Sequence, residues 1–345
     1  MFLRNIWYIG AWSPEVTVKP MRRLIMNEPI VMYRCADGQA AMLEDRCSHR
    51  RFPLSKGVVT GDTIQCGYHG LTFDRKGTCV YAPGHDRPAP NSRIHIKAYP
   101  LDERDGIIWI WMGDPEKADC ALIPDLSWLH EPGWRFWTGG YIHLKSQDQG
   151  LAENLLDISH LAYVHKSTMG SDPDLIAGGK TDVSVSDEGV RRTVLFENIP
   201  TPPVYRQSRL VKDKIDQLSL GHIRPGLYQN HVLIRNCGGP PPSADNLTDY
   251  PIQTRSFHGI VPETDVSTHY FNGGGFKEID VQAINGDQAH QILLEDVDVL
   301  EAIQANELLV GHRPVVNLRN DAAVMRWRAF MKKASEAETA QVAIA

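Results

Sequence analysis

Two short motifs, each with one cysteine and one histidine, lie sixteen residues apart near the N-terminus: Cys47-Ser48-His49 and Cys66-Gly67-Tyr68-His69. Thiolate and imidazole ligands in equal number suit either tetrahedral zinc or a 2Fe-2S cluster with two Cys on one iron and two His on the other. Zinc fingers group like ligands together, whereas each motif here carries one of each. Two β-loops can therefore hold a two-iron cluster from opposite sides, and the spacing favours the cluster over a structural zinc site.

A second group of metal-binding residue types lies in the segment 151–164, whose pattern predicts a helix. Asp157 precedes His160 by three residues, so the two are neighbours on one helical face and the carboxylate can orient the imidazole. His165 follows His160 by five residues, which places it about 140° around a helix at ~100° per residue. The helix must therefore end or bulge before both rings can reach one ion.

A third ligand is expected in residues 287–309, whose apolar spacing predicts a long helix. The apolar stripe of this helix consists of Ile292, Leu293, Val297, Val299, Leu300 and Ile303. Projection at ~100° per residue places Asp296 near the middle of the stripe. The carboxylates outside it are Glu295, Asp298 and Glu301. Because burial of an unpaired carboxylate costs several kcal/mol, Asp296 requires a cation or a metal, unless the helical register is wrong.

His160, His165 and Asp296 together form a set of two imidazoles and one carboxylate. Such a facial triad leaves positions open on ferrous iron for dioxygen. The second half of the chain is therefore predicted to hold one mononuclear iron.

The elements around these residues indicate two domains, predicted at residues 1–118 and 119–345. From Trp7 to Trp111 short β-branched and aromatic runs alternate with turn pairs, which is typical of a small all-β domain. The second domain places strand-like segments, up to about Tyr270, between two helical ones, and this order predicts an α+β fold. The tail, residues 334–345, is predicted to fray.

Composition narrows the class of protein. The chain has 345 residues, with 36 Lys+Arg against 42 Asp+Glu and a net charge of -6, so no nucleic-acid or membrane partner is expected. No apolar run approaches the ~20 residues of a membrane span, and no export signal precedes the six cysteines. These features predict a cytoplasmic protein with reduced cysteines.

Both halves of the chain resemble Rieske non-haem iron oxygenases, and the resemblance covers nearly its whole length. Within that family the chain resembles the short group of vanillate O-demethylase, dicamba monooxygenase and toluenesulfonate monooxygenase. The supporting segments are Arg4-Asn5-Ile6-Trp7-Tyr8, Asn154-Leu155-Leu156-Asp157 and Val261-Pro262-Glu263-Thr264. The implied fold is an N-terminal all-β Rieske 2Fe-2S domain followed by an α+β helix-grip catalytic domain with a curved antiparallel sheet.

The resemblance also implies roles for the two motifs. Cys47 and Cys66 would bind the inner ferric iron of the cluster, and His49 and His69 the outer iron that gains the electron. Imidazole ligands raise the cluster potential to roughly -150 to +300 mV, from about -400 mV for an all-cysteine plant-type cluster. Asn154, one turn before Asp157, would face the mononuclear iron.

The implied assembly is a head-to-tail homotrimer, in which Asp157 bridges His69 of one subunit and His160 of the next. Electrons would come ultimately from NAD(P)H through a separate flavin and iron-sulfur reductase or a ferredoxin, because no flavin or nicotinamide motif occurs in the sequence. A chain with two metal sites would therefore depend on a partner for reduction.

The substrate pocket is expected between residues 203 and 276. Asn230 and His258 are candidates for substrate contact, with a structural hydrogen bond as the alternative for each. Arginines in this region that could pair with a carboxylate or sulfonate are Arg206, Arg209, Arg224, Arg235 and Arg255. The predicted reaction is oxidation of an aromatic acid, by O-demethylation. Alternatives are ring hydroxylation or dihydroxylation, N-demethylation, diaryl-ether cleavage, a Rieske electron carrier and a protein with a decayed active site.

Overall fold

The computed structural model describes residues 2–84, 94–166, 168, 173–174, 178–202, 205–206, 208–239, 243, 246–277, 286–311 and 313–344. The chain forms two compact units. One consists of residues 2–124 with Val261–Asp265, and the other contains residues 125–260 and the chain from Val266 onward. The chain therefore passes from the first unit to the second between Pro124 and Asp125. The domain boundary between residues 118 and 119 stays a prediction.

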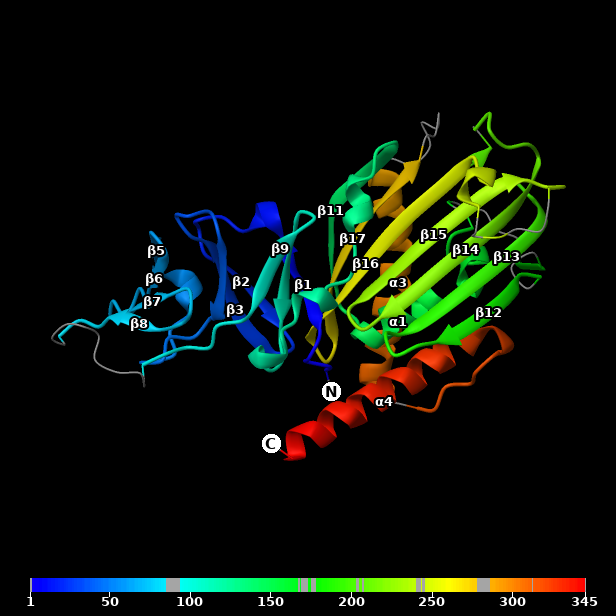
Figure 1. Cartoon of the computed structure of the whole chain (residues 1–345). Coiled ribbons are helices and arrows are strands. Elements are labelled where there is room, and N and C mark those ends of the chain that lie inside the picture. The colour runs from blue at the N-terminus through cyan, green and yellow to red at the C-terminus, as the bar shows by residue number, and fades with distance from the viewer. Residues whose placement is uncertain are drawn as a thin grey trace. The chain divides into compact units, whose positions relative to one another are not determined.

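The described residues of the N-terminal unit form three small antiparallel sheets, as its short β-branched runs predict (Figure 1). The first has the order β1 (Trp7–Trp12), β10 (Ile107–Trp111) and β9 (Leu101–Arg104). The second has the order β2 (Met21–Ile25), β3 (Glu28–Arg34) and β4 (Ala40–Glu44). The third has the order β5 (Val58–Thr60), β6 (Thr63–Gln65), β7 (Thr72–Asp74) and β8 (Cys79–Tyr81). The loops around the third sheet carry both cysteine motifs.

One seven-stranded sheet forms the centre of the C-terminal unit. Its strand order is β11 (Trp134–Leu144), β17 (Ser267–Lys277), β16 (Ile252–Thr264), β15 (Leu227–Asn236), β14 (Lys214–Arg224), β13 (Val190–Pro200) and β12 (Lys180–Val185). The strand pairs β11–β17, β12–β13, β13–β14, β14–β15 and β15–β16 are antiparallel. The register shifts by a bulge or irregularity within the β11–β17 and β13–β14 pairs. Such irregularities bend a sheet, consistent with the curved sheet expected.

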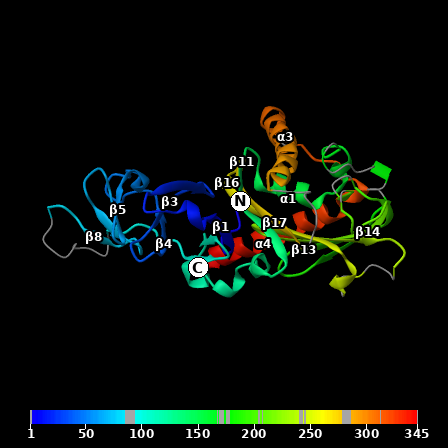
Figure 2. The same ribbon diagram turned by 90° about the horizontal axis from the view of Figure 1, so that it is seen from above.

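Among the described residues, three helices cover this sheet: α1 (Asp148–Leu156), α3 (Gly286–Val310) and α4 (Ala322–Ile344). Figures 1 and 2 show α1 and α3 on the same face of the strands. The core below them joins residues from the sheet, such as Ile142 and Ile223, with Leu151, Leu300 and Trp327 of the helices. The predicted α+β helix-grip class is confirmed.

Helix α4 continues from Ala322 to Ile344 and so runs through most of the tail that was predicted to fray; the fraying itself stays a prediction. Val324, Trp327 and Phe330 recur at helical spacing, and Val324 and Trp327 are buried in the core. Arg328 of α4 also pairs with Glu153 of α1, with 2.5 Å between Nη2 and Oε2. This apolar period was the sequence signal for the helix.

None of the described helices is long and apolar enough to span a membrane.

Candidate metal centres

The first candidate centre lies on two loops with the same backbone pattern. The amide of Cys47 donates to the carbonyl of Phe52 (3.0 Å), and that of Cys66 donates to Leu71 (2.8 Å), five residues on in each case. Four residues on, Arg51 and Gly70 each return a hydrogen bond to the cysteine carbonyl and have positive φ, 60° and 73°. The two motifs therefore form two similar turns.

Their side chains divide by exposure. Cys47 and Cys66 are 1% and 2% exposed, whereas His49 and His69 are exposed and their ring centroids lie 4.6 Å apart. Burial raises the pKa of the Cys47 thiol to about 11. Two buried sulfurs and two exposed imidazoles suit an inner and an outer iron.

Asp45 connects the two ends of the loop that carries Cys47 and His49. Its buried carboxylate accepts hydrogen bonds from the amide (2.6 Å) and hydroxyl (2.7 Å) of Ser55. Ser55 lies in the short helix Leu54–Lys56, so the segment from Cys47 to Phe52 is closed at both ends.

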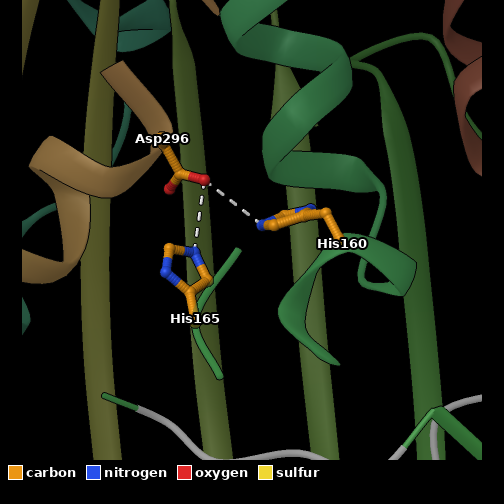
Figure 3. A group of neighbouring side chains, drawn as sticks. All are labelled: His160, His165 and Asp296. Carbon is orange, nitrogen blue, oxygen red and sulfur yellow. Dashed lines mark ion pairs between the residues drawn. The ribbon is translucent and has the colours of Figure 1, made fainter. Parts of the chain in front are cut away.

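The second candidate centre brings His160, His165 and Asp296 together (Figure 3). Oδ1 of Asp296 lies 3.4 Å from Nε2 of His160 and 3.2 Å from Nε2 of His165. Ligand atoms about 2.1 Å from one ion and at right angles to one another are about 3.0 Å apart. The three side chains therefore fit a single metal ion, and their ligand atoms all lie within 4.8 Å of one another.

The segment 151–164, predicted as one helix, is α-helical only at its start, and the α-helix ends before both histidines. Helix α1 ends at Leu156, Asp157 has extended backbone (ψ 114°), and a short 3-10 helix covers Ser159–Ala162. The Asp157 carboxylate accepts a hydrogen bond from the amide of Ser159 (2.7 Å), which favours this turn. His160 lies in the 3-10 helix and His165 follows its end, so the two rings do not keep α-helical spacing and can face one point.

The Asp157 carboxylate makes no hydrogen bond to the His160 ring in the described part of the chain, although its charge opposes the lowering of the His160 pKa by burial. Nδ1 of His160 is buried and has no hydrogen-bond partner in the described part of the chain. The orienting and bridging role of Asp157 therefore stays a prediction.

The helix-face argument for Asp296 agrees with the structure, since this carboxylate is 6% exposed on α3. Leu293, Val297 and Leu300 pack into the core as expected. Val299 and Ile303 do not: they are 36% and 51% exposed, because the buried face continues through Gln304 instead. The predicted stripe was too wide at its C-terminal end.

Helix α3 is joined to the start of α1 by its polar side chains. Oε1 of Gln304 accepts a hydrogen bond from the backbone amide of Gln147 (2.9 Å), the residue that precedes α1. In the last turn of α1, Nδ2 of Asn154 donates to Oδ1 of Asp296 (3.0 Å). Asn154 thus lies beside the triad, as the sequence predicted.

One residue of this centre was missed by sequence reasoning. Glu295 lies 2.7 Å from Nδ1 of His165 through its Oε2, although it was placed outside the buried stripe. The spacing gave no signal for it, because the contact joins residues 130 positions apart.

The charge states suit metal binding. Burial lowers the pKa of His160 despite the Asp296 charge, so this imidazole is neutral near pH 7. Burial lowers the pKa of His165, but hydrogen bonds to Asp296 and Glu295 outweigh burial and raise it. Burial raises the pKa of Asp296, yet the hydrogen bond and charge of His165 outweigh this and lower it. The site therefore offers a carboxylate and two imidazoles to which a metal cation can bind, with release of any proton on the ligand nitrogens.

A cavity of about 260 Å³ adjoins the triad. Opposite residues of β15 and β16 face it in successive pairs, Tyr228 with His258, Asn230 with Ser256 and Val232 with Thr254. Their spacing of two follows from the alternation of side chains along a strand. The other apolar or aromatic lining residues are Trp137, Leu155, Ile158, Leu161, Phe196, Tyr205, Phe276, Ile292 and Leu293.

The predicted range 203–276 covers only part of this wall, because α1, β11, β13 and α3 also contribute. Asn230 and His258 both face the cavity. His258 contacts Tyr270 through Nδ1 (2.6 Å) and Ser256 through Nε2 (3.1 Å), and burial lowers its pKa to about 4. Of the five arginines proposed, only Arg255 lines the cavity.

Arg192 also lines the cavity and was not among the candidates. It is 3% exposed and donates to the Leu156 carbonyl at the end of α1 and to the Tyr228 hydroxyl (3.1 Å). Arg255 pairs with Glu131 (2.9 Å), whereas Arg192 has no acidic partner in the described residues.

Family comparisons agree with this geometry. Residues 7–100 match the Rieske [2Fe-2S] domain, and residues 145–337 match the vanillate O-demethylase oxygenase C-terminal domain. The second match covers more than half of the chain.

Similar proteins match over nearly their whole length. The oxygenase component of dicamba O-demethylase from Stenotrophomonas maltophilia is 33% identical, with 98% of this chain and 99% of the relative covered. The iron-sulfur subunit of a toluene-4-sulfonate monooxygenase system from Comamonas testosteroni is 31% identical, with 98% of each chain covered. A structure of dicamba monooxygenase with non-haem iron and dicamba has a TM-score of 0.78 and 31% identity over 99% of each chain.

The name oxygenase component implies a separate reductase. The two domain matches, the long relatives and the two candidate centres lead to one conclusion. The chain belongs to the Rieske non-haem iron oxygenases and is the oxygenase component of a monooxygenase system, in the group of vanillate O-demethylase, dicamba monooxygenase and toluenesulfonate monooxygenase.

Proposed function

We propose that this protein oxidises an aromatic acid by O-demethylation, with a 2Fe-2S cluster on Cys47, His49, Cys66 and His69 and one Fe(II) on His160, His165 and Asp296. The observation that carries the proposal is the triad, which opens onto a cavity with largely apolar walls. When bound, the mononuclear iron supplies the activation of dioxygen and the cluster supplies single electrons.

The chain's own residues hold the metal ligands in place and shape the substrate cavity. Asp296 and the two imidazoles leave one side of the ion open. Asn154 holds Oδ1 of Asp296 through a hydrogen bond of 3.0 Å, which limits rotation of the carboxylate. The apolar wall, with Leu155 and Phe196, excludes water from the face where substrate is to lie.

Size and charge favour a small aromatic anion as the substrate. The cavity of about 260 Å³ is near the lower limit of ligand pockets, which suits a single substituted ring. Arg192 places a buried cation without an acidic partner among the described residues in its wall, and such a charge favours an anionic ligand. Ser219 donates to Oδ1 of Asn230 (3.0 Å), so the Asn230 amide group can donate to a carboxylate.

Formaldehyde release tests the reaction. The enzyme is supplied with a compatible reductase, NAD(P)H and a panel of methoxylated, methylated and unsubstituted aromatic acids. We expect one formaldehyde per methoxy substrate consumed. A hydroxylated or dihydroxylated ring without formaldehyde would instead establish one of the alternative reactions, and an inert protein with two irons per chain rather than three would indicate an electron carrier.

The assembly is the second part of the proposal: a homotrimer in which Asp157 joins His69 of one subunit to His160 of the next. The buried Nδ1 of His160, without a partner in the described residues, is an atom that such a bridge would satisfy. Asp157→Asn should then keep both metals and slow electron transfer between them.

Mixed assembly provides the matched test. A variant without its cluster (His69→Ala) and a variant without its mononuclear iron (His160→Ala) are each inactive alone, but together should regain part of the activity across subunit boundaries. Mixed trimers that form and remain inactive would exclude transfer between subunits.

A further inference from the structure

Two adjacent carboxylates of α3 contact the two nitrogens of one imidazole. Oδ1 of Asp296 lies 3.2 Å from Nε2 of His165, and Oε2 of Glu295 lies 2.7 Å from Nδ1 of the same ring. Figure 3 shows the second ring nitrogen of His165 turned away from Asp296. The ring is therefore held from both ends by neighbouring residues of one helix.

The Glu295 contact decides which nitrogen of His165 carries the proton. The Glu295 carboxylate at 2.7 Å can only accept a hydrogen bond, so Nδ1 carries a proton and Nε2 is the nitrogen left to bind a metal in the triad. Acceptors of this kind fix the ring orientation and increase the basicity of the ligand nitrogen.

Glu295 is itself fixed. Thr168 donates through Oγ1 to the same Oε2 (2.7 Å), so one carboxylate oxygen receives two hydrogen bonds. The His165 side chain is 2% exposed and that of Glu295 is 27% exposed, so water reaches only the carboxylate end of the contact.

The two imidazoles of the triad differ in this respect. Nδ1 of His160 is buried without a partner in the described residues, whereas Nδ1 of His165 has a charged acceptor within the chain. The support for His165 is thus complete in a single subunit.

We propose that Glu295 is a positioning residue that holds His165 as a metal ligand, by fixing its Nδ1–H tautomer and by increasing electron donation from its Nε2. The proposal rests on the function proposed above, because it takes the triad to bind Fe(II). It assigns the adjacent carboxylates of α3 separate tasks: Asp296 is the ligand and Glu295 orients the neighbouring ligand.

The test compares Glu295→Ala and Glu295→Gln with Asp298→Asn, a matched loss of one charge at an exposed position of the same helix. The first readout is the Fe(II) dissociation constant from competition with a chelator. We expect Glu295→Ala to weaken binding about 10- to 100-fold, as loss of such a partner does elsewhere. Glu295→Gln keeps an acceptor oxygen and should lose less, and Asp298→Asn should bind like the wild type.

The second readout is the midpoint potential of the mononuclear iron, which a merely structural role would not change. Glu295→Gln should raise it, because a neutral acceptor draws the Nδ1 proton less strongly and Nε2 donates less to the ferric ion. Thr168→Val should weaken Fe(II) binding by a smaller amount, because Glu295 loses one of the hydrogen bonds that fix its carboxylate.

The outcomes separate the inference from the proposed function. Wild-type affinity and potential in both Glu295 variants would overturn the role of Glu295 while leaving the triad intact. If wild-type protein holds no iron that Asp296→Ala removes, the proposed function itself fails. The visible spectrum of the cluster and the thermal unfolding curve show for each variant whether the chain has folded.

Discussion

Asp45 offers a test of how the N-terminal unit holds its cluster loop. The Asp45 side chain is fully buried and accepts two hydrogen bonds from Ser55, at 2.6 and 2.7 Å. Arg22 lies 3.6 Å away with a half-exposed side chain, so solvent screens that pair and it contributes little. Asp45→Ala therefore removes two charge-assisted hydrogen bonds and leaves the Ser55 amide without its acceptor.

The magnitude follows from these contacts. Hydrogen bonds to a charged group contribute about 1.5–3 kcal/mol each, so the loss is about 3–6 kcal/mol. For a unit of this size a loss of about 4 kcal/mol lowers the melting temperature by roughly 15 °C. Asp45→Asn keeps one acceptor oxygen and should fall between Asp45→Ala and the wild type.

The assay is the temperature at which the visible absorption of the cluster bleaches. The control is Glu44→Ala, which removes the neighbouring carboxylate and its 2.6 Å pair with a half-exposed Arg46, worth at most about 1 kcal/mol. If Asp45→Ala bleaches within a few degrees of Glu44→Ala, the Asp45–Ser55 contact does not hold the loop.

Three further predictions concern the two centres and the sheet. Replacing Cys66 or His69 by Ala should abolish the visible Rieske absorption, and a full-strength spectrum in either variant would contradict the ligand assignment. Asp296→Ala should lose the mononuclear iron and turnover while the Rieske absorption stays intact; an active variant with normal iron content would require another carboxylate. Burial, with the charges of two arginines, lowers the pKa of His222 to about 4 from 6.5, so its stabilising contribution is complete above about pH 6.5. That contribution is lost as pH falls toward 4, by about 1.4 kcal/mol per unit, and His222→Gln should lose less stability between pH 7 and 5 in urea unfolding.

The sequence by itself determined the candidate ligands of both centres. Each cysteine motif lies within one turn, and the five-residue separation of His160 and His165 requires the helix to end or bulge. Both inferences used only local spacing in the sequence. Asp296 was found because helical periodicity relates residues of one element to a buried face. The resemblance to a known family rested on the same short segments.

Only the tertiary structure decided which groups act on these ligands. Glu295 contacts His165, and Asn154 contacts Asp296, across 130 and 142 residues of chain. Periodicity places a side chain on a face of its own helix but does not say which atom of a distant element it meets. The same holds for Arg192, whose cation joins the cavity wall only because β13 lies beside β14 and the end of α1.

Which residues of a helix face are buried also depends on the tertiary structure. Val299 and Ile303 are apolar yet exposed, because the buried face of α3 runs through Asp296, Leu300 and Gln304 instead. In α4, by contrast, the apolar residues Val324 and Trp327 pack into the core. A helix is buried where another element meets it, and that meeting depends on contacts between residues far apart in the chain.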